Sequence, residues 1–340
     1  MTSFQGEKAL VLAHYAALAS ATPDTVAALL AERVSEDWYW RGVHPWHERT
    51  GVQAVVAAFW APFLTSFSRV QRRQDVFMAG RNEIDGFSSV WTVSMGHLMG
   101  LFDASFLGIP ATGKIAMLRC AEFNRVENGR IVETAFFCDL LHLMRQAGLD
   151  PLPHQTAAHL VQPGPATHDG LLLDDADARE SEKTLALIDR MIGDVAKNSN
   201  DGRGSAPRDA TPQEELARCW HDDMIWWGPE GIGATCTIDR YVEQHQQPFR
   251  RNLSNRTFNG HVCRLAEGTI GGFFGWPNLT LTSTGEYMGL PATGRRGDMR
   301  VVDIYRRDGD KLAENWIFID IPHFLMMQGI DVIADTLAVR

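Results

Sequence analysis

The chain has 340 residues, of which 45% are hydrophobic and 22% are charged, and its net charge is −10. This length suits two domains better than a single core. The acidic balance disfavours nucleic acid and membrane surfaces as partners, and the N-terminus lacks the pattern of a signal peptide. Five cysteines without CxxC spacing are typical of reduced, mostly buried thiols. We therefore expect a cytoplasmic protein that binds neither nucleic acid nor membrane.

Residues 1–150 show helical patterns first and strand patterns afterwards. Three helices are expected, over 6–19, 23–33 and 51–67. Four strands rich in β-branched and aromatic residues should follow, over 69–78, 88–98, 114–126 and 130–139. Asn128-Gly129 predicts a tight hairpin between the last two strands, and a short helix over 140–146 should end at Gly148. Helices packed on one face of an antiparallel sheet make an α+β domain.

A proline-rich stretch predicts a linker over residues 151–180, and a second domain is expected over 181–340. Helical patterns recur there at 182–196, 212–221 and 238–249, and residues 198–209 read as a loose connection between two of them.

The second half repeats the first. Pro110-Ala111-Thr112-Gly113 returns 181 residues later as Pro291-Ala292-Thr293-Gly294 (291 − 110 = 181). The same step carries Glu133, Asp139, His142 and Gly148 onto Glu314, Asp320, His323 and Gly329. Upstream the step is 186, since Asp37, Trp40 and Gly42 match Asp223, Trp226 and Gly228. The chain therefore consists of two copies of one domain.

The repeated acid ends a strand in each copy. Side chains of a strand alternate between faces, so Glu133, Phe137 and Asp139 share one face, as do Glu314, Trp316, Phe318 and Asp320. A carboxylate among apolar neighbours has a raised pKa and can shuttle a proton near neutral pH. The alternative is an N-cap, because each Asp precedes a short helix, and the two roles are compatible.

Other repeated side chains extend the candidate site. His142 and His323 follow the Asp by one helical turn and either assist acid/base chemistry or make local hydrogen bonds. Glu133 and Glu314 either face the pocket or pair with Arg119 and Arg300 on the preceding strand. Trp40 and Trp226 are pocket walls or core residues. His44, His47 and Glu48 resemble a metal motif, but the second copy has Glu230 and Gly233 at the two His positions, so no metal is expected.

The run Gly108 to Lys114, followed by Arg119, Glu122, Arg125, Glu133 and Asp139, resembles the SnoaL-like polyketide cyclase group of the nuclear transport factor two-like superfamily. The second copy matches through residues 285–294, Arg300, Asp303, Glu314, Trp316 and Asp320. The resemblance implies a cone-shaped, cystatin-like α+β barrel around an apolar pocket, and ring closure by aldol condensation without cofactor or metal. It also implies that Asp139 and Asp320 move the proton. The copies differ at Ala135 and Trp316, so their pockets need not be equivalent.

Three functions remain open. The first is a cofactor-independent acid/base enzyme, of cyclase, isomerase or lyase type, acting on a small apolar or polyketide-like carbonyl compound. The second is a protein that binds a small hydrophobic molecule without chemistry, and the third is a scaffold whose pocket is filled by side chains. We expect either an internal pseudo-dimer of the two copies or a homodimer.

Overall fold

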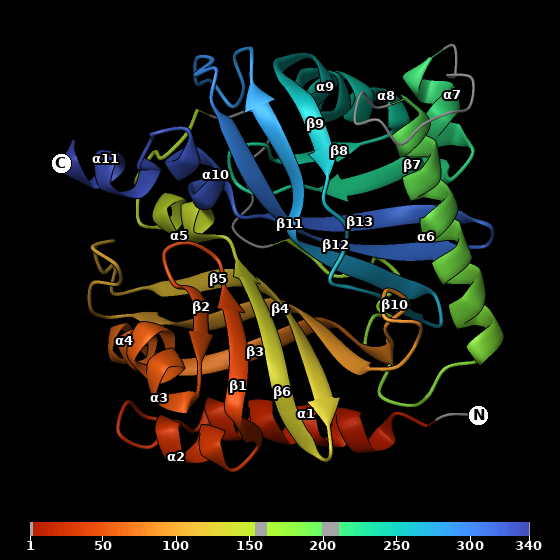
Figure 1. Cartoon of the computed structure of the whole chain (residues 1–340). Coiled ribbons are helices and arrows are strands. Elements are labelled where there is room, and N and C mark those ends of the chain that lie inside the picture. Colours follow the sequence, from red (N-terminus) through yellow and green to blue (C-terminus); the bar gives the residue numbers. More distant parts are fainter. Residues whose placement is uncertain (1–2, 154–161, 199–210, 340) are drawn as a thin grey trace. The chain divides into compact units, whose positions relative to one another are not determined.

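The computed structural model describes residues 3–153, 162–198 and 211–339 (Figure 1). They form two compact units. The first contains residues 3–150, 162–175 and 336–339, and the second contains 151–153, 176–198 and 211–335. The loose connection expected at 198–209 lies almost wholly outside the described residues. No disulfide joins the five cysteines, and all except Cys236 are buried, as the sequence predicted.

The first unit has one six-stranded sheet, in the order β2-β1-β6-β5-β4-β3. Its strands are β1 (Val34–Gly42), β2 (His47–Thr50), β3 (Phe67–Arg81), β4 (Val90–Phe102), β5 (Ile115–Glu127) and β6 (Arg130–Cys138). Its helices are α1 (Gln5–Ala19), α2 (Val26–Ala31), α3 (Val52–Val55), the π-helical segment η1 (Val56–Trp60), α4 (Ala61–Ser66) and α5 (Leu140–Gln146). Helix α1 packs against β3 and β4.

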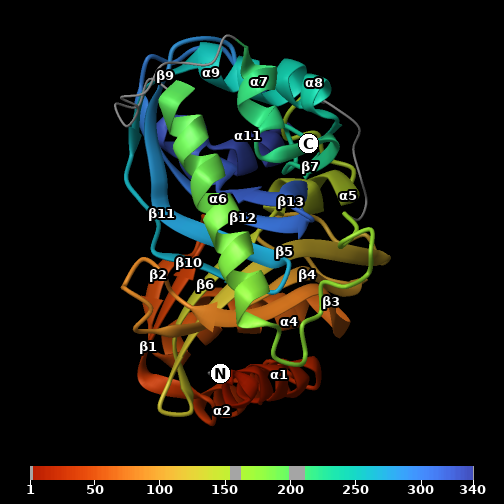
Figure 2. The same ribbon diagram turned by 90° about the vertical axis from the view of Figure 1, so that its right-hand side faces the viewer.

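The second unit repeats this plan, with the order β10-β11-β12-β13-β7-β8 and β9 pairing with β11. Its strands are β7 (Trp220–Trp227), β8 (Ala234–Cys236), β9 (Leu253–Phe258), β10 (Cys263–Glu267), β11 (Ile270–Ser283), β12 (Arg296–Asp308) and β13 (Lys311–Ile319). Its helices are α6 (Ala178–Asn198), α7 (Pro212–Ala217), α8 (Ile238–Tyr241), η2 (Val242–Gln246), α9 (Gln247–Asn252), α10 (Ile321–Met327) and α11 (Val332–Ala338). Helix α6 packs against β10 and β11 (Figure 2).

The fold is α+β with a curved sheet and helices in each unit, as predicted, but the four strands predicted for the first unit did not include β1 and β2. Strands β1 and β7 pair parallel to β6 and β13, whereas the other neighbours are antiparallel. The helix expected over 212–221 ends at Ala217 because β7 begins at Trp220. Acidic residues interrupt the apolar pattern of β1 and of β7, as Glu36-Asp37 does in β1. The alternation of buried and exposed positions in these strands was therefore not recognised in the sequence.

Several local predictions hold. The β5–β6 hairpin turns at Asn128 and Gly129, whose φ angles of 50° and 71° are those of the left-handed region that a tight hairpin requires. Helix α5 ends before Gly148, which has a φ of 77°. The two π-helical segments lie at equivalent positions, because 242 − 56 = 186. Within the described ranges, no helix combines the length and apolarity needed to cross a bilayer.

Candidate functional site

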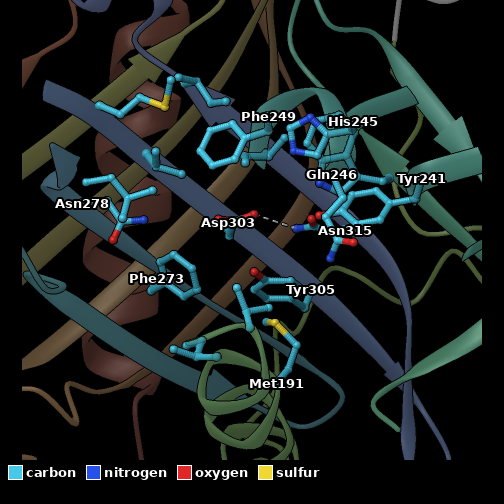
Figure 3. Close-up of a pocket in the computed structure, with 18 of the residues that line it drawn as sticks. Met191, Tyr241, His245, Gln246, Phe249, Phe273, Asn278, Asp303, Tyr305 and Asn315 are labelled. Carbon is cyan, nitrogen blue, oxygen red and sulfur yellow. Dashed lines mark hydrogen bonds between the residues drawn. The ribbon is translucent and has the colours of Figure 1, made fainter. Parts of the chain in front are cut away.

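A cavity of about 200 Å³ lies inside the second unit, between its helices and one face of its sheet (Figure 3). Alternate residues of β12 and β13 form one wall: Met299, Val301, Asp303 and Tyr305 from β12, and Asn315, Ile317 and Ile319 from β13. The helical side supplies Met191, Tyr241, His245, Gln246 and Phe249. The cavity is therefore mainly apolar, with a small set of polar side chains, which is the usual character of a small-molecule site.

The cavity lies over the opposite face of β13 from the one predicted. Asn315, Ile317 and Ile319 line it, while Glu314, Trp316 and Phe318 alternate with them and point to the other side. The first unit agrees, since Phe136 packs against Phe59 of η1 with ring centroids 4.9 Å apart. Alternation identifies two faces but does not say which one the helices cover. Both faces of β13 are buried, so solvent exposure does not distinguish the face that the helices cover from the other face.

Asp303 is the carboxyl group of this cavity. Its Oδ1 accepts a hydrogen bond from Nδ2 of Asn315 at 3.1 Å (Figure 3). Burial raises the pKa of Asp303 to about 7, although hydrogen bonds from Asn315 and Tyr305 act in the opposite direction. Near neutral pH the group is therefore present in both its protonated and its ionised form, which is the condition for efficient proton transfer.

Two phenols accompany this carboxyl group. Burial raises the pKa of Tyr241 and of Tyr305, and the nearby Asp303 raises both further. Both side chains therefore stay protonated at neutral pH. A protonated phenol in a buried site can donate a hydrogen bond to an oxygen that gains negative charge.

His245 belongs to the helical wall and stacks on Trp226, with ring centroids 4.0 Å apart. Burial lowers the pKa of His245 to about 3, and the Arg250 guanidinium lowers it further, so the imidazole is neutral at pH 7. Arg250 itself donates to both carboxylate oxygens of Glu215, at 2.7 and 3.0 Å.

The first unit places a different acid at the position of Asp303. Glu122 precedes Asp303 by the repeat step (303 − 122 = 181) and accepts from Nη2 of Arg72 at 3.1 Å. Burial raises the pKa of Glu122, but Arg72 and hydrogen bonds outweigh it and hold the pKa below its ordinary value. Strand register makes Phe258 the counterpart of Arg72, because Arg72 lies opposite Leu98 and Phe258 lies opposite Leu279. Leu98 and Leu279 in turn face the equivalent residues Leu118 and Met299.

Side chains occupy the corresponding interior of the first unit. Phe59 and Trp60 stand where the second unit has His245 and Gln246, because 245 − 59 = 186. Phe59 contacts Trp40 and Trp46, with ring centroids 6.0 and 5.0 Å apart. The polar groups there bond to one another: Trp38 donates to Thr134 at 2.9 Å, and Asn124 donates to the Tyr15 hydroxyl at 3.0 Å.

Comparisons with known families match both halves of the chain. A SnoaL-like domain model matches residues 11–134, and a SnoaL-like polyketide cyclase model matches residues 278–325. Each half of the chain therefore contains a SnoaL-like domain. Each of its two SnoaL-like domains thus shows a family match in the region that carries its sheet.

Solved structures of single domains are also similar to parts of this chain. A putative SnoaL-like polyketide cyclase from Jannaschia sp. CCS1 is 20% identical, with 42% of this chain and 90% of that one covered and a TM-score of 0.33. IdmH, a putative polyketide cyclase from Streptomyces antibioticus, is 18% identical, with 42% and 99% covered and a TM-score of 0.33. An NTF2-like protein from Burkholderia xenovorans LB400 is 10% identical, with 44% and 97% covered and a TM-score of 0.34. No curated protein matches the chain.

Asp139 and Asp320 cap helices in the two SnoaL-like domains, which is the alternative that the sequence left open. Asp139 Oδ1 accepts from the backbone N–H of His142 at 3.0 Å, and Asp320 Oδ1 accepts from that of His323 at 3.2 Å. Asp320 Oδ2 also pairs with Nη1 of Arg300 at 3.3 Å. The residues that line the cavity do not include Asp320. The geometry therefore gives it a capping and ion-pairing role.

The predicted ion pairs involve other arginines. Glu133 pairs with Arg41 and Arg125, and Glu314 pairs with Arg306. The expected pairing with Arg119 and Arg300 is wrong because the hairpin register places these arginines at the other end of the strands. Asp139 and Asp320 donate their backbone N–H groups to the carbonyl oxygens of Arg119 and Arg300.

The remaining predicted residues divide between cavity and core. Trp226 lines the cavity, whereas Trp40 lies in the aromatic interior of the first domain. Phe137, Phe318 and Trp316 are buried on the far faces of their strands. His142 is buried beside Gln146, and His323 donates its backbone N–H to Asp320. Among the described residues, no three His, Cys, Asp or Glu side chains are grouped as metal ligands would be.

Asp303 was not among the predicted site residues. The repeat contained the signal, since an acid stands at both 122 and 303 with the same step of 181 that singled out Asp139 and Asp320.

Proposed function

We propose that the second SnoaL-like domain is a cofactor-independent acid/base enzyme that acts on a small carbonyl compound, and that Asp303 moves the proton. The observation that supports this proposal is a buried carboxyl group with a pKa of about 7 that lines an apolar cavity. Asp303 thereby differs from the helix-capping residues Asp139 and Asp320, each of which accepts a hydrogen bond from a backbone N–H group.

The residues of the cavity suit an aldol-type proton transfer. Ionised Asp303 takes a proton from the carbon next to a carbonyl group, and the electron pair of that C–H bond forms an enolate. Once Asp303 holds the proton, the hydroxyl group of Tyr305 turns from Asp303 to the enolate oxygen, and the hydroxyl group of Tyr241 donates to the same oxygen. The enolate carbon then attacks a second carbonyl carbon of the same molecule, and the resulting alkoxide takes the proton back from Asp303. No oxidant or reductant is needed.

The first half of this mechanism is testable without the natural substrate. 2-Tetralone is a small bicyclic ketone whose α-protons exchange with deuterium in heavy water through the enolate, and NMR follows that exchange. The wild-type protein should accelerate it. Asp303→Asn should remove about 10²-fold or more of the acceleration, the usual contribution of a general base. Asp320→Asn is the matched control and should leave the acceleration largely unchanged.

The alternative is that the domain binds a small hydrophobic molecule without chemistry. In that case 2-tetralone would bind, as shown by quenching of the fluorescence of Trp226 and its neighbours, yet wild-type exchange would equal the buffer rate. Equal exchange by wild type and Asp303→Asn would also refute the acid/base proposal.

We further propose that the first SnoaL-like domain serves as a scaffold. Its aromatic side chains fill the space that the cavity occupies in the second domain. Arg72 neutralises the charge of Glu122, the acid at the position of Asp303.

A further inference from the structure

The cavity of the second domain has a reacting end and an apolar end along β12. Tyr305 pairs with Asn315 in the ladder, and Asp303 lies opposite Ile317. Farther along the strand come Val301, opposite Ile319, and then Met299. The polar side chains that β12 and β13 contribute to the cavity thus lie at one end of this wall, although Asn278 of β11 also lines the cavity next to Leu279.

A second group of polar atoms comes from the helical wall. Within the described part of the chain, His245 Nδ1 and Gln246 Oε1 are buried without a hydrogen-bond partner, although both residues line the cavity (Figure 3). Gln246 Nε2 donates to the Glu215 carboxylate at 3.3 Å. A carboxylate accepts hydrogen bonds, so this contact fixes the amide nitrogen toward Glu215 and leaves the amide oxygen as an acceptor. A ligand that satisfies this oxygen must supply a donor.

The two guanidinium groups that line the cavity already have protein partners. Arg250 is held by Glu215, and Arg256 donates to the carbonyl oxygens of Leu253 and Arg250, at 2.6 and 3.1 Å. The imidazole of His245 is neutral. An anionic ligand would therefore lose its hydration beside the partly ionised Asp303, which is strongly unfavourable.

The size of the cavity limits the ligand further. Its volume of about 200 Å³ is somewhat larger than the roughly 150 Å³ of an apolar cavity that accepts benzene. One ring with substituents, or two fused rings, fits this space.

We infer that the second domain selects an uncharged compound of one or two rings that presents a hydroxyl group to His245 and Gln246 while its reacting carbonyl group lies at Asp303. This inference names the substrate class of the proposed enzyme and rests on the same cavity. A hydroxyl group is suited to this position because it donates its one proton to Gln246 Oε1 and accepts a hydrogen bond from His245 in the tautomer that carries the proton on Nδ1. His245 and Gln246 are thus specificity-determining residues, and the first domain has Phe59 and Trp60 in their places.

Four probes with one skeleton test this on the wild-type protein: naphthalene, 2-naphthol, 2,6-dihydroxynaphthalene and 2-naphthoate, with affinities from isothermal titration or fluorescence quenching. Each hydroxyl group that finds a buried partner should tighten binding by about three- to tenfold. The dihydroxy compound should therefore bind most tightly and the carboxylate most weakly. Naphthalene binding as tightly as the dihydroxy compound, or 2-naphthoate binding best, would overturn the inference.

His245→Phe supplies the ring of the first domain and can keep the stack on Trp226. Because Gln246 Oε1 remains as an acceptor, this variant should reduce the advantage of 2,6-dihydroxynaphthalene over 2-naphthol, and it should bind naphthalene at least as well as the wild type does. Met299→Leu, at the apolar end, is the control and should change the affinity for all probes by similar factors. An unchanged preference for the dihydroxy compound in His245→Phe would contradict the role of His245.

These outcomes are separable from those of the proposed function. If the wild-type protein shows no preference for hydroxylated probes but exchanges 2-tetralone in an Asp303-dependent manner, only the inferred substrate class is rejected. A clear hydroxyl preference without any exchange would reject only the catalytic role.

Discussion

Asp303 and Glu122 occupy the same position in their two sheets, yet only Glu122 has a guanidinium partner in the structure, Nη2 of Arg72 at 3.1 Å. At the place of Arg72 the second domain has Phe258, which lines the cavity. This one exchange removes the cation that pairs with the acid and places an apolar ring in the lining of the cavity. Because of this exchange, burial raises the pKa of Asp303, whereas Arg72 counteracts the effect of burial on the pKa of Glu122.

Asp303→Asn should stabilise the protein at high pH. The pKa of Asp303 is about 7 when folded and 3.8 in its ordinary state, so the folded protein favours the protonated form. Stability is therefore lost as the pH rises from about 4 to about 7, and the full loss, on the order of 4 kcal/mol, applies above pH 7. Calorimetry should show a higher Tm for the variant than for wild type near pH 8.5 and little difference near pH 4. A lower Tm for the variant near pH 8.5 would contradict this assignment.

Phe258→Arg should convert the second domain toward the state of the first. A guanidinium beside Asp303 stabilises the carboxylate, so the pKa of Asp303 should fall by about one to three units. The longer side chain should also reduce the cavity. Exchange of 2-tetralone should lose its dependence on pH near 7 and become slower. Phe258→Leu adds no charge and should retain the pH dependence of exchange near pH 7. If Phe258→Leu also lost this pH dependence, the charge of the introduced arginine would not be the cause of the change in Phe258→Arg.

Arg72→Met should destabilise the first domain by about 3–5 kcal/mol, because it leaves Glu122 buried without its cation. The double variant Arg72→Met, Glu122→Gln removes both charges and should recover much of that loss. Denaturant unfolding, followed by the transition of the first domain, measures both. Equal unfolding midpoints for the two variants would mean that the ion pair is not what stabilises this interior.

Asp320→Ala should be more harmful than Asp320→Asn. Alanine removes both the helix cap and the partner of Arg300, whereas asparagine can still cap α10. Loss of the cap alone is worth about 0.5–2 kcal/mol, and the unpaired arginine adds to it. Urea unfolding gives the difference. If Asp320→Asn instead left stability unchanged but abolished exchange of 2-tetralone, the catalytic role first predicted for Asp320 would be restored.

The sequence was sufficient for the duplication, the domain type and most helices and strands, because repeats and periodic patterns are local. It identified Trp226 as a candidate wall and the two Asp residues as candidate caps. It did not identify the face of the sheet that the helices cover. That choice depends on packing of distant segments, such as η2 against β12 and β13, and both faces of β13 are buried.

The exchange of Arg72 for Phe258 also escaped prediction. Strand register shows that the two residues are equivalent, since each lies opposite a residue that faces Leu118 or Met299. The sequence step of 186 does relate them, but nothing in the local sequence connected either residue to an acid some 45 to 50 positions away.

The protonation of Asp303 is the most direct test of its role as the proton-transferring group, because measuring it requires neither a substrate nor a partner. Infrared difference spectra of wild type against Asp303→Asn isolate the carbonyl stretch of the protonated carboxyl group and follow it with pH. We expect a band that disappears with a midpoint near pH 7. A midpoint below about pH 5, the range of an ordinary carboxyl group, would contradict it.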